Sequence, residues 1–178
     1  MGTGNIADTS NIQNPCFFYD TPGTYNVCLD VRNINGCLKT YCETVIIRAT
    51  PNVLFGTSDT SICINNSILF FDSTTVASDA NITNWHWDFG TGNSSDTSII
   101  QNPSFNYTSA GIIDIVLKVV DNFGCFDSDT QTVQVFDIPT VSAFSDTIIC
   151  RNDSVQLLAT GALNYTWNGT ATSTSDTT

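Results

Sequence analysis

The sequence of 178 residues has little positive charge, and this scarcity excludes several classes of function. Only 5 Lys and Arg stand against 17 Asp and Glu, which gives a formal net charge of −12. A surface of this sign repels the phosphate backbones of nucleic acids and the headgroups of anionic membranes. We therefore expect neither nucleic acid nor a membrane surface as a partner.

Residues that carry catalysis and metal binding are also scarce. His86 is the single histidine, and no Cys-x-x-Cys pair is present, so the usual ligands of a zinc site are missing. His86 lies between Trp85 and Trp87, and alternation along a strand turns it to the opposite face from both tryptophans. Catalysis needs a base beside a nucleophile or a metal. The sequence therefore predicts no enzymatic activity, no cofactor and no metal.

Long apolar runs are absent as well. A membrane-spanning helix needs about 20 consecutive apolar residues, and the best candidate, 111–120, is interrupted by Asp114 and Lys118. Seven cysteines in a chain poor in Lys suggest an oxidising compartment. We expect a secreted, extracellular or cell-surface protein that does not insert into a membrane.

The sequence contains an internal repeat. The block from Gly2 to Cys37 returns almost intact and ends at Cys125, a shift of 88 (125 − 37). The segment ending at Cys63 returns and ends at Cys150, a shift of 87 (150 − 63). Trp87 aligns with Trp167. Repeats of this length indicate tandem domains.

The repeat divides the chain into one whole unit and two partial ones. Residues 51–138 are predicted to form a complete unit, 1–50 the back half of a unit, and 139–178 the front half of another. A unit of roughly 88 residues is long enough to bury its own core.

Apolar residues alternate with other residues along several segments. In the first unit Tyr25, Val27, Leu29 and Val31 alternate in this way, and 111–121 repeats the pattern. Such a period of two predicts strands that place one face in a core. No segment has a helical pattern, and short strands separated by turns favour an antiparallel sandwich.

Specific residues connect this pattern to a known family. Trp87-Asp-Phe-Gly-Thr-Gly92, Asn102-Pro103 with Tyr107, and the strand ending Asp121-Asn-Phe-Gly124 together resemble the polycystic-kidney-disease (PKD) repeat. With Cys63 and Gly124-Cys125, they are similar to the version in large secreted surface proteins of Bacteroidetes. The resemblance implies an all-β fold of tandem immunoglobulin-like, PKD-type antiparallel β-sandwiches. We expect Trp87 and Tyr107, with their repeat mates Trp167 and Tyr19, in the cores.

Four cysteines are predicted to form bridges of one type. Cys63 and Cys125 would close a loop of about sixty residues in the complete unit, which would contribute roughly 4 kcal/mol of stability. Cys37 aligns with Cys125, and Cys150 aligns with Cys63. If one chain's front half completes another chain's back half, Cys37 of one chain would bond Cys150 of its neighbour.

The remaining three cysteines leave an alternative open. Cys28 and Cys42 fall on the outward phase of adjacent strands and could form a cross-strand bridge, which leaves Cys16 over. Pairing Cys16 with Cys28 instead leaves Cys42 unpaired, and the sequence does not decide between the two.

Modification sites are numerous. Asn-x-Ser/Thr, the acceptor of N-linked glycans, occurs at Asn65, Asn81, Asn93, Asn106, Asn152, Asn164 and Asn168. The family resemblance adds O-glycan candidates at Thr147 and Ser154, each of which follows an Asp and precedes an apolar residue. The alternative is ordinary loop composition rich in Ser and Thr.

These observations favour a structural function. We expect a non-catalytic subunit of an extracellular glycosylated fibre, in which identical chains join head to tail by completing split sandwiches. The alternative is a segment of a giant multi-repeat surface adhesin or stalk that spaces a glycan-binding domain.

Overall fold

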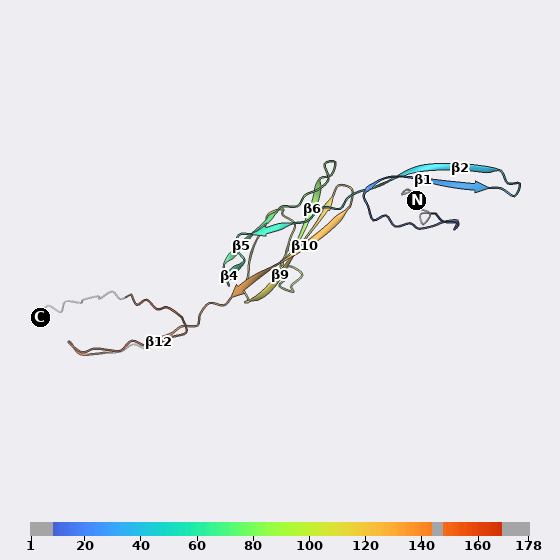
Figure 1. Ribbon diagram of the computed structural model, residues 1–178. Coiled ribbons are helices and arrows are strands. Elements are labelled where there is room, and N and C mark those ends of the chain that lie inside the picture. The colour runs from blue at the N-terminus through green and yellow to red at the C-terminus, as the bar shows by residue number, and fades with distance from the viewer. Residues whose placement is uncertain (1–8, 144–147, 169–178) are drawn as a thin grey trace.

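Strands alone make up the regular structure in the described part of the chain, residues 9–143 and 148–168 of the computed structural model (Figure 1). In chain order they are β1 (Gly23–Arg32), β2 (Leu38–Ile47), β3 (Phe55–Thr57), β4 (Ser61–Cys63), β5 (Ser67–Asp72), β6 (Ile82–Asp88), β7 (Thr97–Ser98), β8 (Ser104–Asn106), β9 (Gly111–Asp121), β10 (Phe126–Phe136), β11 (Ser142–Ala143) and β12 (Ala159–Thr160). The predicted all-β fold class is confirmed. This part of the chain contains no helix that is long and apolar enough to cross a bilayer.

The middle of the chain forms a sandwich of two sheets. One sheet has the order β4-β10-β9-β6-β7, and the other has the order β3-β5-β8. The period of two along β9 places Ile115, Leu117 and Val119 in the interior with 0% exposure, while Asp114 and Lys118 face solvent. Alternation of apolar and polar residues therefore decides which face of β9 is covered.

Large side chains from the smaller sheet and from β6 fill the interior. Ile68, Phe70 and Trp87 are fully buried, and the rings of Phe70 and Trp87 lie 5.4 Å apart. Burial of each such side chain contributes about 1.5–3 kcal/mol relative to exposure. The indole Nε1 of Trp87 donates a hydrogen bond to the Ile100 carbonyl at 3.0 Å. The predicted core position of Trp87 is confirmed.

Tyr107, predicted in the core, is 1% exposed and donates its hydroxyl to the Phe89 carbonyl at 3.1 Å. Burial, and next the negative charge of Asp88, raise the pKa of Tyr107 above its ordinary value. The phenol therefore stays neutral and keeps its hydrogen bond where a free tyrosine would ionise.

The sandwich departs from the expected antiparallel arrangement at one place. β4 pairs with β10 in parallel, with Ser61 opposite Gln134 and Cys63 opposite Phe136. β4 has only three residues, and its connection to β10 runs through the whole unit. Local sequence patterns do not show such a long-range pairing.

β1 and β2 form a separate antiparallel hairpin at one end of the sandwich (Figure 1). Its register places Gly23 opposite Ile47, and the register of β9 and β10 places Gly111 opposite Val135. Both residues of the second pair lie 88 positions after those of the first. The hairpin therefore repeats the last two strands of the sandwich in sequence and in pairing.

The segment beyond β10 lies at the opposite end of the sandwich from the hairpin (Figure 1). It contains the short pair β11 and β12, with Ala143 opposite Ala159. This pair uses the segments that correspond to β3 and β5 in the middle unit. The described molecule is thus elongated, with the hairpin of β1 and β2 at one end and the pair of β11 and β12 at the other.

Candidate functional site

The hairpin of β1 and β2, which we call the back-half hairpin, presents an apolar face that no second sheet among the described residues covers. Leu29 and Val31 are 59% and 52% exposed, whereas their repeat mates Leu117 and Val119 are 0% exposed in the sandwich. The residue types and the strand register are the same, so the difference comes from the facing sheet, which covers β9 and which no described strand supplies to β1. Exposed apolar faces of this kind mark interaction surfaces.

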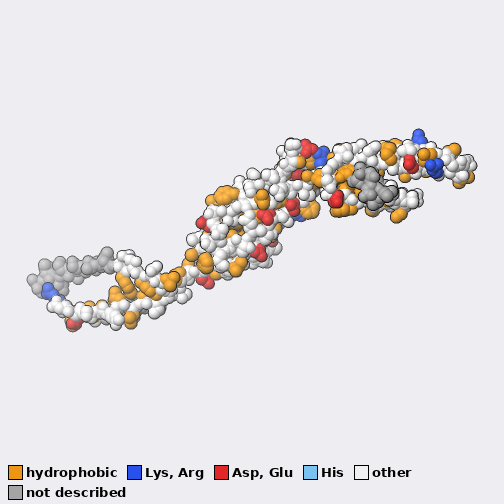
Figure 2. Space-filling model, viewed as in Figure 1, with side chains coloured by type: hydrophobic (Ala, Val, Ile, Leu, Met, Phe, Trp, Pro, Cys, Tyr) orange, Lys and Arg blue, Asp and Glu red, His pale blue; other side chains and the backbone are white. Residues whose placement is uncertain are grey.

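The segment after β10, which we call the front-half segment, also exposes large apolar residues whose equivalents are buried in the sandwich. Leu157 is 43% exposed and Trp167 is 49% exposed, while the equivalent Phe70 and Trp87 are fully buried. The prediction that Trp167 lies in a core is wrong for the single chain, because the strands that would cover it belong to a back half. Figure 2 shows hydrophobic side chains at the surface over both terminal parts.

Part of the hairpin face is covered by the segment that precedes it. Tyr19, predicted as a core residue, is half-buried, and its ring lies 4.7 Å from that of Tyr25 and 4.9 Å from that of Phe17. This aromatic cluster lies at the end of β1 near the sandwich. The face farther along β1, at Leu29 and Val31, remains open.

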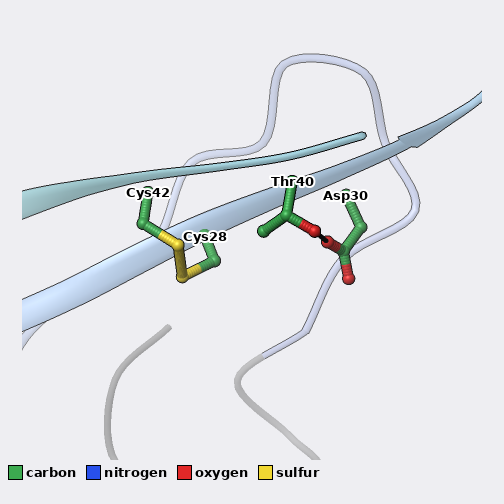
Figure 3. The surroundings of a disulfide bond; sticks show 4 residues. All are labelled: Cys28, Asp30, Thr40 and Cys42. Atoms are coloured by element: carbon green, nitrogen blue, oxygen red, sulfur yellow. Dashed lines mark hydrogen bonds between the residues drawn. A yellow bond between two sulfur atoms is a disulfide. The ribbon is translucent and has the colours of Figure 1, made fainter. Parts of the chain in front are cut away.

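A disulfide holds the hairpin together. Cys28 and Cys42 lie directly opposite each other on β1 and β2 and are bonded, beside a hydrogen bond from the Thr40 hydroxyl to Asp30 (Figure 3). Of the two pairings that the sequence left open, the structure has Cys28 with Cys42, and Cys16 is free. The bridge is on the outward face, so it leaves the open core face accessible.

The predicted bridge between Cys63 and Cys125 is wrong, since both thiols are free. Cys63 pairs with Phe136 at the end of β10, whereas Cys125 directly precedes the start of β10. The 11-residue strand between them spans about 35 Å at ~3.3 Å per residue. A disulfide needs Cα atoms about 4.4–6.8 Å apart, so these cysteines cannot bond within one unit.

The same geometry removes the basis for a bond between Cys37 and Cys150. That prediction rested on the alignment of Cys37 with Cys125 and of Cys150 with Cys63. In the single chain, Cys37 and Cys150 are free and exposed. A split unit built like the middle one would hold Cys37 and Cys150 at opposite ends. A bond between Cys37 of one chain and Cys150 of its neighbour therefore does not fit a split unit of this structure.

The turns that carry Cys37 and Cys125 have the same construction. The Asn33 side-chain oxygen accepts hydrogen bonds from the amides of Asn35 and Cys37 at 3.0 Å. Asp121 accepts from the amides of Phe123 and Cys125 at 2.9 Å. An Asn or Asp at this place satisfies the turn's amides with its own side chain. Each cysteine is therefore held in a defined turn at the same end of its unit.

The turns that carry Cys63 and Cys150 also match each other. The Asn66 amide donates to the Cys63 carbonyl at 3.3 Å, and the Asp153 amide donates to the Cys150 carbonyl at 3.1 Å. Each turn contains an asparagine with positive φ, 66° at Asn65 and 73° at Asn152. Asparagine tolerates this left-handed conformation better than most residues. The turn at Cys150 thus reproduces the turn at Cys63.

Arg48 connects the hairpin to the sandwich, and the sequence alone did not indicate this. Its guanidinium forms an ion pair with Asp79 and lies 3.9 Å from the centre of the Phe123 ring. Gly23 and Ile47 of the hairpin line the same cleft as Asp79 and Phe123. The turn between β9 and β10 therefore faces the unit that precedes it. Arg48 aligns with Phe136 in the repeat. This replacement of an apolar residue by an arginine was the signal in the sequence that could have indicated the contact.

The candidate glycan acceptors are distributed over the surface. The seven asparagines and Ser154 are all exposed, and Thr147 lies outside the described residues. His86 is exposed, as alternation predicted. Among the residues that the structure describes, no three His, Cys, Asp or Glu side chains are grouped as metal ligands.

The two packed sheets and their filled interior define an immunoglobulin-like β-sandwich. A family model of the PKD domain matches residues 48–136, half of the chain. The chain therefore belongs to the PKD domain family, as the sequence motifs implied.

The chain is also similar to a curated protein and to solved domains. The pre-pro-metalloprotease PrtV of Vibrio cholerae is 40% identical over 63 residues, which are 35% of this chain and 6% of that protein. The solved PKD1 domain of Vibrio anguillarum Epp is 27% identical, with a TM-score of 0.44, and the match covers 52% of this chain and all of that domain. The solved PKD1 domain of PrtV is 31% identical, with a TM-score of 0.42, and the match covers 49% of this chain and 99% of that domain. The chain thus matches only a small part of its curated relative.

Proposed function

We propose that the chain is a non-catalytic structural subunit of an extracellular fibre, in which the front half of one copy packs on the back half of the next. One observation carries the proposal. Leu117 of β9 and Phe70 of β5 are fully buried on the two facing sheets of the middle unit, whereas their repeat mates Leu29 and Leu157 are 59% and 43% exposed. The two exposed faces are therefore the two sides of one core.

The placement of these faces favours a polymer. The hairpin and the front-half strands lie at opposite ends of the sandwich (Figure 1). A head-to-tail contact between two different surfaces generates an open filament when successive copies do not close into a ring, and surfaces at opposite ends of an elongated molecule favour the filament. Completing a sandwich with strands from another chain also pairs sheet edges that are otherwise left open.

An oxidising, extracellular location supports the same function. The Cys28 to Cys42 disulfide persists in oxidising compartments and is rare in the cytosol. The seven exposed Asn-x-Ser/Thr sites are accessible to glycan transfer. Covalent glycans are thus part of the proposal, and peptide mass spectrometry of native material measures them directly.

A stalk in a giant multi-repeat adhesin is the second candidate. It is favoured by the match to PrtV, where the similar segment is only 6% of a long chain. In this case, adjoining repeats of the same polypeptide would cover the two exposed faces, and the units would space a glycan-binding domain. A reading frame that encodes thousands of residues would support the stalk.

Sedimentation of the full chain over a wide concentration range tests the fibre. We expect the mass to rise with concentration and electron micrographs to show filaments. A chain that stays monomeric at every concentration would refute the proposal. The cysteines should be kept reduced in one series, because packing of the faces does not need a disulfide.

A further inference from the structure

The free cysteines lie at opposite poles of each unit. We call the end at which the chain enters the sandwich near Pro51 the N-terminal pole, and the end at which β10 stops at Phe136 the C-terminal pole. Cys63 is opposite Phe136 at the C-terminal pole, and Cys125 is in the turn at the N-terminal pole. By repeat alignment and matching turns, Cys150 belongs at a C-terminal pole and Cys37 at an N-terminal pole.

We propose that these cysteines form disulfides across the junctions between consecutive units. Taking the fibre from the proposed function, Cys150 of one copy bonds Cys125 of the next copy, and Cys63 of the first copy bonds Cys37 of the next. Each joint between two copies thus carries two disulfides, one at each end of the completed sandwich. Both bonds connect different copies, and neither lies within a unit.

The junction around Arg48 supports the pair of Cys150 and Cys125. Arg48 occupies the place of Phe136 in the repeat, and Phe136 is the strand partner of Cys63. A completed back half therefore places Cys150 of the neighbouring copy beside Arg48, at one inter-strand spacing of about 5 Å. Arg48 itself contacts Phe123, two residues before Cys125. Both sulfurs thus lie at one junction.

The repeat carries the argument to the other pair. Cys37 lies in the turn at the tip of the hairpin, which is the N-terminal pole of the completed unit (Figure 1). In the fibre this pole follows the C-terminal pole of the preceding copy's sandwich, where Cys63 is exposed. The same two turn types therefore meet at both junctions of the joint.

The chemistry requires accessible thiols and an oxidant. Cys37, Cys63 and Cys150 are exposed, and Cys125 is half-buried. Two thiols each lose a proton, one sulfur-sulfur bond forms, and two electrons pass to a small-molecule disulfide such as oxidised glutathione. That oxidant is reduced to two thiols by stepwise thiol exchange.

Mapping of the bonds in oxidised full-length chain tests the assignment. The chain is assembled, treated with oxidised glutathione, alkylated, digested and analysed by mass spectrometry. We expect peptides that join Cys150 to Cys125 and Cys63 to Cys37. Non-reducing electrophoresis should show a ladder of multimers that reductant collapses to monomer.

A double variant separates this pairing from a bond within the split unit. Cys63→Ser with Cys125→Ser removes one partner from each proposed bond, so the ladder should disappear while filaments still form. A Cys37 to Cys150 bond would leave the ladder intact in the same variant, which would overturn the inference. Cys16→Ser is the matched control and should leave the ladder unchanged.

Linked peptides test the cross-junction bonds, and filaments test the fibre, so the two proposals can fail separately. Filaments that contain other linked peptides, or no linked peptides after oxidation, would overturn the cross-junction bonds and leave the fibre standing. A wild-type chain that forms neither filaments nor multimers would overturn both.

Discussion

Two leucines in the same repeat position provide a sensitive comparison of folding with assembly. Leu117 is fully buried in the sandwich, and Leu29 is 59% exposed on the hairpin. We predict that Leu117→Ala destabilises the middle unit, whereas Leu29→Ala leaves its stability unchanged and weakens association between copies. The same chemical change thus acts on different equilibria.

The expected magnitudes follow from the exposed fractions. Truncating a fully buried leucine costs about 3–4 kcal/mol through lost burial and the cavity left behind. In the free chain Leu29 is already 59% exposed. About 0.6 of a ~3 kcal/mol loss, or ~2 kcal/mol, therefore appears only when the joint forms. This corresponds to a dissociation constant between copies that is roughly 25-fold larger, at ~1.4 kcal/mol per factor of ten.

Urea unfolding, followed by tryptophan fluorescence, reports the stability of the middle unit through buried Trp87. Sedimentation velocity reports association of the same samples. Asn26→Ala, on the outward face of the strand that carries Leu29, is the matched control and should change neither quantity. If Leu29→Ala and Asn26→Ala associate equally well, the proposed use of the hairpin face is refuted.

Three further predictions concern single features of the fold. A Cβ at Gly90 would clash with the Asp114 carbonyl, whereas one at Gly92 meets open space, and both residues have positive φ. In urea unfolding, Gly92→Ala should therefore lower the free energy of unfolding by about 1 kcal/mol, and Gly90→Ala should lower it by clearly more. Equal losses of stability in the two variants would contradict the clash. Tyr107→Phe should cost about 1–2 kcal/mol at neutral pH; because the raised pKa of Tyr107 contributes stability below about pH 10 that is lost as pH rises, the difference from wild type should narrow at higher pH, and a constant difference would refute this linkage. Cys28→Ser should remove about 3 kcal/mol of loop-closure stabilisation from the hairpin, seen as faster amide hydrogen exchange in β1 and β2, while unchanged exchange there would show that the disulfide is dispensable.

The sequence predicted the strands and their faces well where the signal was local. Alternation along 111–121 identified the buried face of β9 because one side of that strand meets a core and the other meets water. The Asn33 and Asp121 turns are equally local, since the side chains that satisfy the turn amides lie within the turn. The PKD motifs then supplied the class of fold.

The failures all concern relations between distant residues. Repeat alignment showed that Cys37 is equivalent to Cys125, but it did not show at which pole either one lies. That depends on β4 pairing in parallel with the end of β10, through three residues only. Trp167 occupies a core position by alignment, yet Trp87 is buried beside Leu117 of β9, and the equivalent of β9 belongs to a back half.

The parallel pairing of β4 with β10 has a mechanical consequence. A pull along the molecule draws the entering end of the sandwich one way and the exit at Phe136 the other, so these two strands are drawn past each other lengthwise. Their hydrogen bonds are then loaded together in shear and cannot open one after another like a zip. Each sandwich in a row of such units therefore resists tension through the pairing of β4 with β10.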